Sequence, residues 1–553
     1  MAKYVLISDT TLSNEYRNFP LLEFLSCVSS TLIPSFIYNT LKGKPPVAIN
    51  GRATKSPYPV RKIEASLLTE NPEKDVVVAH EDFIEKFIGP ETEVIGINTM
   101  DPFGIGPLTM SFPVLFSSPH SPYVKKEFEI LIKRINKARK GTRAKLIVGG
   151  PGVWECMVLP EELDRLGIDY AFQGEADDIA NTLFRDISED SFSNRFFKGF
   201  QTYDEGFHKM WSSHEKIISR RQFSKQYPTM EEIPTIVNTS IKGVAEVMRG
   251  CGIGCDFCEV TLRPLRYYPL EMIKKEVAIN VKGGCMNAWL QSDEIFAFHH
   301  GKNFEPNFEQ LTGLFEAVMS VKGVKRTNPT HGRISIPAAY PDLIQKLSSI
   351  VKAGPTNWIG VQVGLETGSE RLAKIHMPSK TLPLKIGVDG EWKNIVWNGT
   401  RNFNMHYWRP AFTVQVGQPG ELPEDNWETV ELTNWMSNSE VSGRPFEFTI
   451  TPVQNVPLGI LKDMEFSRLV PNESQLAVYY AAYRHLAKLA ARNITMRNGR
   501  SRVLQFGTAA TLAFGGWLTY QYVKRICRKK GVDTDKIDRM GLQTPIPVSN
   551  TKK

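Results

Sequence analysis

The N-terminal part of the chain alternates short apolar runs with amphipathic segments. Residues 93–98 and 145–150 are rich in β-branched and other apolar residues, which is typical of buried strands. Between them, residues 124–140 carry apolar side chains close to helical spacing, with lysine and arginine on the opposite face. Parallel strands linked by such a helix form a right-handed crossover. We therefore predict that residues 1–200 form an α/β domain, a doubly wound parallel sheet with helices on both faces.

A second series of predicted strands begins near residue 241. A helix that starts at Pro269 follows the first strand and ends before Gly283. The predicted strands of this series are residues 243–248, 287–296, 332–336, 358–366 and 411–416. Strands that alternate with helices can close into a barrel, which carries its chemistry at the carboxyl ends of its strands. We predict such a barrel over residues 241–455.

Three segments lack this alternation of strands and helices. Residues 201–240 are polar and low in periodicity, so we interpret them as a linker. Residues 376–408 show no strand–helix alternation, and we predict an inserted loop over the active site. Residues 456–553 are predicted to form a helical C-terminal region, with a helix over residues 472–496.

Residues 503–523 carry no charge, and arginine and lysine residues flank them on both sides. This length would just span a bilayer, but its glutamines, threonines and glycines make a poor membrane span. Basic flanks with Trp517, Tyr520 and Tyr522 suit the headgroup region of a membrane. Two interpretations therefore remain open: a helix in peripheral contact with a membrane surface, or a helix buried in the core.

Composition narrows the class of protein. A chain of 553 residues is long enough for about three domains. Its net charge of +8 is modest, and no run of like charges interleaved with aromatic residues indicates nucleic acid as a partner. Seven cysteines do not form a disulfide framework, and residues 1–9 indicate a short strand rather than a signal peptide. We predict a cytoplasmic protein, at the inner face of the cell membrane if the 503–523 helix contacts lipid.

Three of the seven cysteines lie close together, at Cys251, Cys255 and Cys258. Thiolates are soft ligands that suit iron–sulfur clusters or zinc, and glycines between them allow a tight loop. Because no fourth cysteine follows closely, a four-cysteine site is incomplete, whereas a cubane cluster held by three sulfurs would keep one iron open. The residues alone leave a zinc knuckle, or cysteines grouped by chance, as alternatives.

The C-x3-C-x2-C spacing, with Phe257 before the last cysteine, resembles the cluster loop of radical S-adenosylmethionine (radical SAM) enzymes. This resemblance implies a partial (β/α)6 barrel and a 4Fe-4S cluster on Cys251, Cys255 and Cys258. It further implies that the open iron binds S-adenosyl-L-methionine, and that a protein such as ferredoxin or flavodoxin supplies the electron.

Two further strands resemble cofactor-binding strands of this family. Asp293 and Glu294 end a predicted strand at the place where the family holds the amino group of S-adenosylmethionine. The usual Gly-Gly-Glu motif is not present here. Gln362 and Glu366 fall on one face of the strand over residues 358–366, which resembles the strand that lines the nucleoside. The resemblance therefore implies that all four residues bind S-adenosylmethionine.

The N-terminal domain resembles the cobalamin-binding domain found in one branch of this family. Gly149 and Gly150 end a strand, and Gly174 follows in an Asp-Tyr-x-x-x-Gly-Glu sequence, so these glycines are candidate cobalamin contacts. Phe103 stands where cobalamin modules with a D-x-H-x-x-G motif place the histidine ligand. Residues 417–421, Gly-Gln-Pro-Gly-Glu, resemble the end of the barrel in the same branch. A flavodoxin-like domain without a ligand remains the alternative.

The resemblance implies an enzyme that cleaves S-adenosylmethionine and removes hydrogen from an unactivated carbon. The aromatic 503–523 segment with its basic flanks suggests a hydrophobic substrate, as in the similar archaeal tetraether lipid ring synthases, which form cyclopentane rings in membrane lipids. The alternative is a cobalamin-dependent radical SAM C-methyltransferase that acts on a small molecule or a protein. A methylthiotransferase is disfavoured because Cys27 and Cys156 are isolated and no second cysteine trio lies upstream. No residue is assigned to the fate of the substrate radical.

Overall fold

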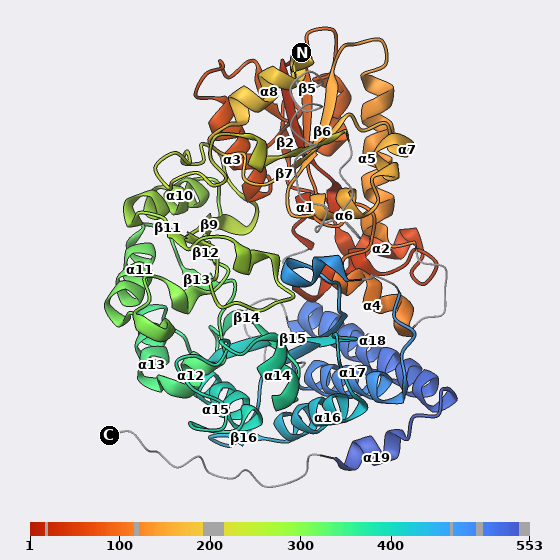
Figure 1. The fold of residues 1–553 in the computed structure, drawn as a ribbon, viewed down its shortest axis with the longest axis vertical. Coiled ribbons are helices and arrows are strands. Elements are labelled where there is room, and N and C mark those ends of the chain that lie inside the picture. The colour runs from red at the N-terminus through yellow and green to blue at the C-terminus, as the bar shows by residue number, and fades with distance from the viewer. Residues whose placement is uncertain (17–19, 116–120, 192–214, 465–467, 494–501, 541–553) are drawn as a thin grey trace.

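A computed structural model describes residues 1–16, 20–115, 121–191, 215–464, 468–493 and 502–540 (Figure 1). The N-terminal unit contains a six-stranded parallel sheet in the order β4-β1-β5-β6-β7-β8. Its strands are β1 (Tyr4–Ser8), β4 (Val76–Val78), β5 (Val94–Asn98), β6 (Lys145–Gly149), β7 (Tyr170–Gln173) and β8 (Ile217–Ser219). The predicted doubly wound α/β sheet is confirmed.

Helices cover both faces of this sheet because its strands are apolar on both sides. Tyr4 and Leu6 pack with α3 (Tyr58–Leu67) and α8 (Ala180–Ser188) on one face. The alternate residues Val5 and Ile7 share a core with helices on the other face. The helices that supply this second core are α5 (Tyr123–Ala138), α6 (Val153–Val158) and α7 (Glu161–Leu166). Two-residue alternation thus divides one sheet between two cores.

Part of the predicted linker belongs to this sheet. Residues 217–219 form β8, which pairs in parallel with β7 at the sheet edge. The linker prediction for residues 201–240 was therefore wrong for this strand. A run of only three residues, with two buried isoleucines, is too short to show a period. The predicted domain boundary near residue 200 lies outside the described residues.

The second unit contains six parallel strands in two groups of three, β9-β12-β13 and β14-β15-β18. A parallel bridge between His331 and Gln362 connects the groups, so the six strands form one curved series. The strands are β9 (Val244–Glu246), β12 (Asn287–Gln291), β13 (Arg326–Pro329), β14 (Ile359–Glu366), β15 (Trp408–Val416) and β18 (Thr449–Gln454). The helices outside them are α10 (Leu270–Lys282), α11 (Phe308–Ser320), α13 (Pro341–Ile350), α15 (Trp392–Met405) and α16 (Pro423–Ser437) (Figure 1). The partial (β/α)6 barrel is confirmed.

Two predictions for barrel elements were wrong. Residues 332–336, predicted as a strand, enter the short helix α12 (Ser335–Ala339). The third strand is β13, which begins six residues upstream of the predicted start and has the polar sequence Arg-Thr-Asn-Pro. The segment 376–408 is not one irregular loop, because it contains α15. Trp392, Ile395 and Phe403 are buried at helical spacing and pack into the barrel core. Only residues 377–391 form the turn-rich connection.

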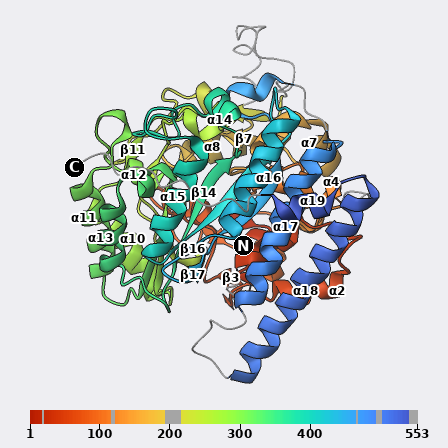
Figure 2. The ribbon, with the colours of Figure 1, turned by 90° about the horizontal axis from the view of Figure 1, so that it is seen from below.

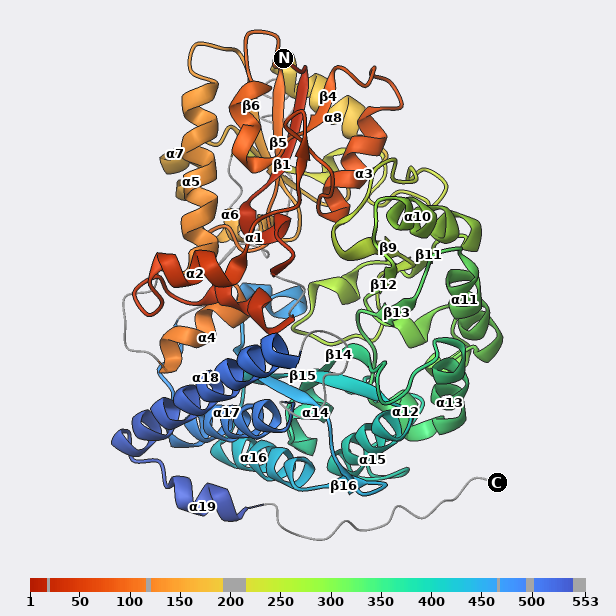
Figure 3. The ribbon, with the colours of Figure 1, turned by 180° about the vertical axis from the view of Figure 1, so that it is seen from behind.

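The C-terminal region is helical, as predicted. Helix α17 (Glu473–Asn493) packs between α16 and α18 (Arg502–Lys529), and α19 (Thr534–Arg539) follows (Figures 2 and 3). No helix in the described part of the chain is long and apolar enough to cross a membrane. One face of α18 is buried, since Val523 and Cys527 have no exposed surface.

Buried polar contacts join the two units. The Lys62 ammonium on α3 lies 2.6 Å from Oε1 of Glu276 on α10, and the Tyr58 hydroxyl donates to Oε2 of the same carboxylate at 2.7 Å. Lys62 also donates to the carbonyl of Pro234 at 2.8 Å. Both charged side chains are only 1% exposed, so neither charge has water as an alternative partner.

We expect Lys62→Met to lower the free energy of unfolding by about 3–5 kcal/mol, because Glu276 would remain as a buried charge without its cation. Thermal denaturation followed by circular dichroism measures the change. Lys346→Met, at an exposed position on α13, is the matched control and should leave the midpoint almost unchanged. Adding Glu276→Leu to Lys62→Met should recover part of the loss, and equal midpoints for all variants would contradict the assignment.

Candidate active site

The three cysteines lie in the loop that follows the first barrel strand. After β9, residues 248–249 form β10, which pairs with β11 (Arg266–Tyr267), and the loop begins at Gly250. Gly250 has a φ of +81°, and a Cβ there would lie 2.5 Å from the carbonyl oxygen of Pro264. Only glycine fits this turn. The local sequence therefore directs the loop across the carboxyl end of the barrel.

The three thiols are sheltered and interact with one another. Burial raises the pKa of all three, that of Cys255 to about 11, and Cys255 and Cys258 each raise the pKa of Cys251 further. Backbone N–H groups act in the opposite direction: that of Ile253 lowers the pKa of Cys251, and two N–H groups after Cys258 lower that of Cys258. Amide donors directed at sulfur stabilise thiolate ligands and tune the potential of iron–sulfur clusters.

The three thiols are the candidate ligands of a metal centre. Within the described ranges, no three His, Cys, Asp or Glu side chains converge closely enough to hold one ion. A zinc knuckle requires such convergence, because all its ligands bind one atom. A cubane distributes its cysteines over separate irons, so its sulfurs stand further apart. Three grouped thiols, with N–H donors on two of the sulfurs, are the candidate ligands of the cluster that the cysteine spacing predicts.

Asp293 and Glu294 lie beside the cysteine loop but have protein partners. Oδ2 of Asp293 accepts a hydrogen bond from the Gly250 N–H at 2.9 Å. Oε1 of Glu294 accepts from the Phe296 N–H at 3.1 Å, and its Oε2 lies 3.4 Å from Nε of Arg333. Burial raises the pKa of both carboxyl groups. Asp293 therefore anchors the start of the loop, and Glu294 belongs to a buried ion pair 2–4% exposed.

Gln362 and Glu366 lie on β14 in different surroundings. Gln362 is exposed between the buried residues Val361 and Val363, so the two faces of the strand differ in burial as alternation predicts. The alternation ends at a register shift between Gly364 and Glu366. Oε1 of Glu366 lies 3.0 Å from a lysine ammonium, and Oε2 accepts from Nε2 of Gln415 at 3.1 Å.

That lysine is Lys380, which the sequence analysis missed. Its ammonium lowers the pKa of Cys255 and Cys258, and Glu366 and the two cysteines together raise the pKa of Lys380 against the effect of burial. It also lies 6.0 Å from the centre of the Phe257 ring. Lys380 thus supplies positive charge beside two of the three thiols. Its place in a segment without periodicity gave no signal in the sequence.

A histidine that the sequence analysis also missed ties the cysteine loop to the last turn of the barrel. Nδ1 of His376 lies 2.8 Å from Oδ2 of Asp256, and its Nε2 donates to the carbonyl of Pro419 at 2.9 Å. The Pro419 turn is held by Glu421, whose Oε2 accepts from the Gly417 N–H at 2.8 Å. The sequence 417–421 therefore supports the cysteine loop.

Arg249, directly before the loop, connects it to the N-terminal sheet. Its guanidinium donates to both oxygens of Asp177 at 2.9 and 3.0 Å and to Glu246 at 2.9–3.0 Å. Oε2 of Glu175 accepts from Arg249 at 2.5 Å, and Arg266 donates to both oxygens of Glu175. Glu175 and Asp177 follow β7. The carboxyl end of the first sheet therefore faces the carboxyl end of the barrel.

The candidate cobalamin glycines differ in their surroundings. A Cβ on Gly149 would meet no atom within 4 Å, so this residue borders open space at the carboxyl end of β6. A Cβ on Gly150 would lie 2.4 Å from Oδ1 of Asn98, and one on Gly174 would lie 2.3 Å from Cβ of Arg220. Close packing of the chain explains these last two glycines without a ligand.

The sheet order places a strand-order reversal between β1 and β5, where open α/β sheets bind ligands. Two polar atoms at the end of β5, Oδ1 of Asn98 and Oγ1 of Thr99, are buried and have no hydrogen-bond partner in the described residues. The Phe103 ring is buried against Phe128, with ring centres 6.3 Å apart, so it belongs to the core. Unpaired polar atoms beside Gly149 fit a ligand at this edge.

Comparisons with known proteins give weak structural likenesses. No protein-family model and no curated protein matches the sequence. The chain is similar to TsrM, a radical S-adenosylmethionine methyltransferase from Kitasatospora setae, in its structure with cobalamin and a [4Fe-4S] cluster: 14% identity, TM-score 0.48, covering 82% of this chain and 72% of that one. TsrM with tryptophan substrate and the analogue aza-SAM gives 13% identity and a TM-score of 0.47 over 78% and 70%.

The apo structure of OxsB, a cobalamin-dependent S-adenosylmethionine radical enzyme, gives 12% identity and a TM-score of 0.44. The match covers 80% of this chain and 54% of OxsB, so this chain matches about half of that protein's length. A likeness of this degree does not show a shared activity.

Proposed function

We propose that the chain is a radical SAM enzyme. The carrying observation is the group of three sheltered thiols, with N–H donors on two of the sulfurs, at the carboxyl end of a six-stranded partial barrel. Cys251, Cys255 and Cys258 would hold a 4Fe-4S cluster. Gln362 and Glu366 would bind S-adenosylmethionine from β14, while Asp293 and Glu294 would keep the loop and the neighbouring turn in place.

When bound, the reduced cluster and S-adenosylmethionine supply a radical that removes hydrogen from an unactivated carbon. The chain's own residues hold the cysteine loop in position. The Gly250–Asp293 hydrogen bond and the His376–Asp256 contact fix the two ends of the loop. The Lys380 ammonium offsets negative charge beside Cys255 and Cys258. An electron donor such as ferredoxin or flavodoxin is the proposed protein partner.

We expect the Cys255→Ala protein to retain little iron after anaerobic reconstitution, because only two of the three thiolate ligands of the cluster would remain. It should form no 5′-deoxyadenosine from S-adenosylmethionine. Iron analysis, electron paramagnetic resonance and chromatography measure these outcomes. The matched control is Cys285→Ser, a buried cysteine outside the loop, which should behave as the unchanged protein. Full activity in Cys255→Ala would refute the proposal.

We further propose that the edge of the N-terminal sheet binds cobalamin. Open space at Gly149, the unpaired Asn98 and Thr99 oxygens and the strand-order reversal support this assignment. Phe103 has no donor atom and is buried in the core, so this position offers no cobalt ligand. Gly149, together with the turns at Gly150 and Gly174, would border the ligand.

We expect Gly149→Val to abolish corrinoid binding while leaving the thermal midpoint almost unchanged, because the new side chain enters open space that the ligand would fill. Absorption spectra after incubation with hydroxocobalamin measure binding. Gly313→Val, in an equally open position on α11, should bind the corrinoid normally. If the unchanged protein bound no corrinoid, the flavodoxin-like alternative would hold.

The barrel wall next to the proposed S-adenosylmethionine site favours a polar substrate. On β15 and β18, one face packs into the core and the other is half-buried, with Thr413, Gln415, Thr449 and Thr451 on the half-buried face. The three threonine hydroxyls have no hydrogen-bond partner among the residues that the structure describes. Covering them with a hydrocarbon chain would cost about 1–3 kcal/mol each. Methyl transfer to carbon in a polar small molecule or a protein is therefore the function that the barrel supports best.

A second candidate is cyclopentane ring formation in archaeal tetraether lipids. The observation that favours it is the exposed aromatic surface of α18, which would suit access to a membrane-resident substrate. Helix α18, which carries this surface, lies on the outside of the helical region (Figure 2), whereas the polar wall belongs to the barrel strands β15 and β18.

Expression in a tetraether-producing host that lacks ring synthesis separates the two candidates. Because the barrel wall is polar, we expect the core lipids to keep their hydrogen count by mass spectrometry in cells whose purified protein still forms 5′-deoxyadenosine. The Cys255→Ala protein is the control. Loss of two hydrogens per ring, dependent on Cys255, would establish the lipid candidate instead.

A further inference from the structure

Helix α18 has one face that stays exposed in the folded chain. Phe514, Trp517, Leu518 and Tyr522 are 60%, 50%, 48% and 47% exposed, whereas Val523 is completely buried. The Phe514 and Trp517 rings stack with their centres 6.0 Å apart. A contiguous group of large exposed apolar side chains on a folded protein marks an interaction surface.

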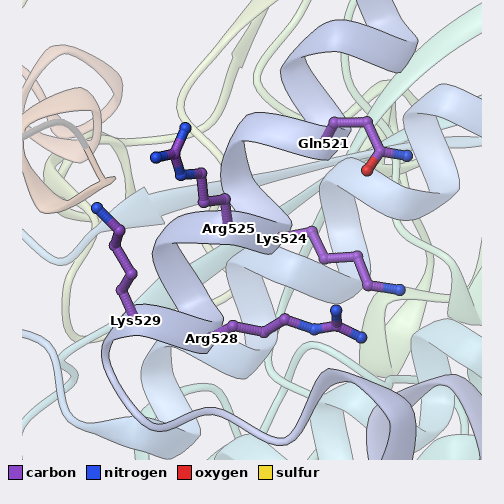
Figure 4. Close-up of a pocket in the computed structure, with 5 residues that line it drawn as sticks. All are labelled: Gln521, Lys524, Arg525, Arg528 and Lys529. Carbon is purple, nitrogen blue, oxygen red and sulfur yellow. The ribbon is translucent and has the colours of Figure 1, made fainter.

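The same face becomes basic one to two turns later. Successive helical residues are about 100° apart, so Arg525 and Lys529 fall within about 60° of Phe514 and Leu518 around the helix axis. Arg525 and Lys529 are exposed and extend to the same side of α18 (Figure 4). The face from Phe514 to Lys529 is about 22 Å long. We call it the outer face of α18.

The cations on the outer face lack the partners that their neighbours have. Lys524 and Arg528 form ion pairs with Asp535 of α19 at 3.8 and 2.9 Å. No carboxylate of the described residues pairs with Arg525 or Lys529. The four basic residues and Gln521 line a surface pocket of about 560 Å³ (Figure 4). Like charges one turn apart destabilise a helix, so this arrangement favours a bound anion.

We propose that the outer face of α18 binds the surface of an anionic lipid bilayer, with the helix lying parallel to the membrane. The aromatic half would enter the boundary between headgroups and acyl chains, and Arg525 and Lys529 would contact lipid phosphates. The helix lies on the membrane and does not cross it, consistent with the hydropathy of the described helices. The proposal goes beyond the radical chemistry, because the outer face takes no part in the barrel.

The charge pattern disfavours a second copy of the chain as the occupant. A two-fold interface through the outer face would bury Phe514 and Trp517 of both copies, but it would also bring two sets of unpaired cations together. An acidic protein would match Arg525 and Lys529 without requiring the aromatic half. A lipid surface is the partner that uses both halves of the face.

Co-sedimentation of the full-length, cluster-loaded chain with vesicles tests the proposal. We expect binding to vesicles of phosphatidylcholine with phosphatidylglycerol, and little binding to phosphatidylcholine alone. Arg525→Gln with Lys529→Gln should lower the apparent affinity about 30-fold, since each cation near an anionic surface adds to binding. Phe514→Ser with Leu518→Ser should also weaken binding. Added salt should weaken binding of the unchanged protein.

The matched control is Lys322→Gln with Lys325→Gln, the same change of charge at exposed residues of the loop after α11, and it should bind as the unchanged protein does. Equal binding by the Arg525/Lys529 variant and this control would overturn the proposal. So would a dimer in solution that Phe514→Ser with Leu518→Ser dissociates, if no vesicle binding is measured. S-adenosylmethionine cleavage by the same preparation shows separately whether the radical chemistry holds.

Discussion

The buried guanidinium of Arg249 is the contact on which the relation of the two units depends. It satisfies Asp177 from the N-terminal unit and Glu246 from the barrel at 2.9–3.0 Å, and it lies directly before the cysteine loop. One buried cation among several carboxylates is stable only while all partners are present, since an unpaired buried charge costs several kcal/mol. Arg249 therefore couples the position of the loop to the orientation of the N-terminal unit, together with the Arg266–Glu175 and Lys62–Glu276 pairs.

This coupling brings two carboxyl edges together. A parallel sheet and a parallel barrel each present their loops, and so their chemistry, at the carboxyl ends of their strands. Because Glu175 and Asp177 follow β7 and Arg249 follows β9, these ion pairs join the carboxyl edge of the first sheet, which includes Gly149, to the start of the cysteine loop. A ligand on the first sheet would then lie toward a substrate held in the barrel.

The sequence predicted the elements whose signals are local. The apolar strands of the first sheet and the alternation at Gln362 follow from a two-residue period, and the cysteine spacing identified the loop. Strand β13 was not predicted because its sequence is polar. Helix α15 was not predicted because Asn and Gly interrupt its buried residues. Lys380 and His376 could not be found, since Lys380 acts on Cys255 and Cys258 and His376 contacts Asp256, all in a loop far away in the chain. Periodicity reports burial, but it does not report which buried groups meet.

At Glu366, side-chain contacts hold a strained backbone conformation in place. Its φ of +63° lies in the left-handed region, which for a residue other than glycine costs about 1–3 kcal/mol. The register shift after Gly364 places it there, and an irregularity of this kind re-aims a side chain at the end of a strand. Contacts of both carboxylate oxygens, with Lys380 and Gln415, compensate the cost. The strained backbone is thus held by the same two side chains that connect β14 to the cysteine loop and to the polar wall.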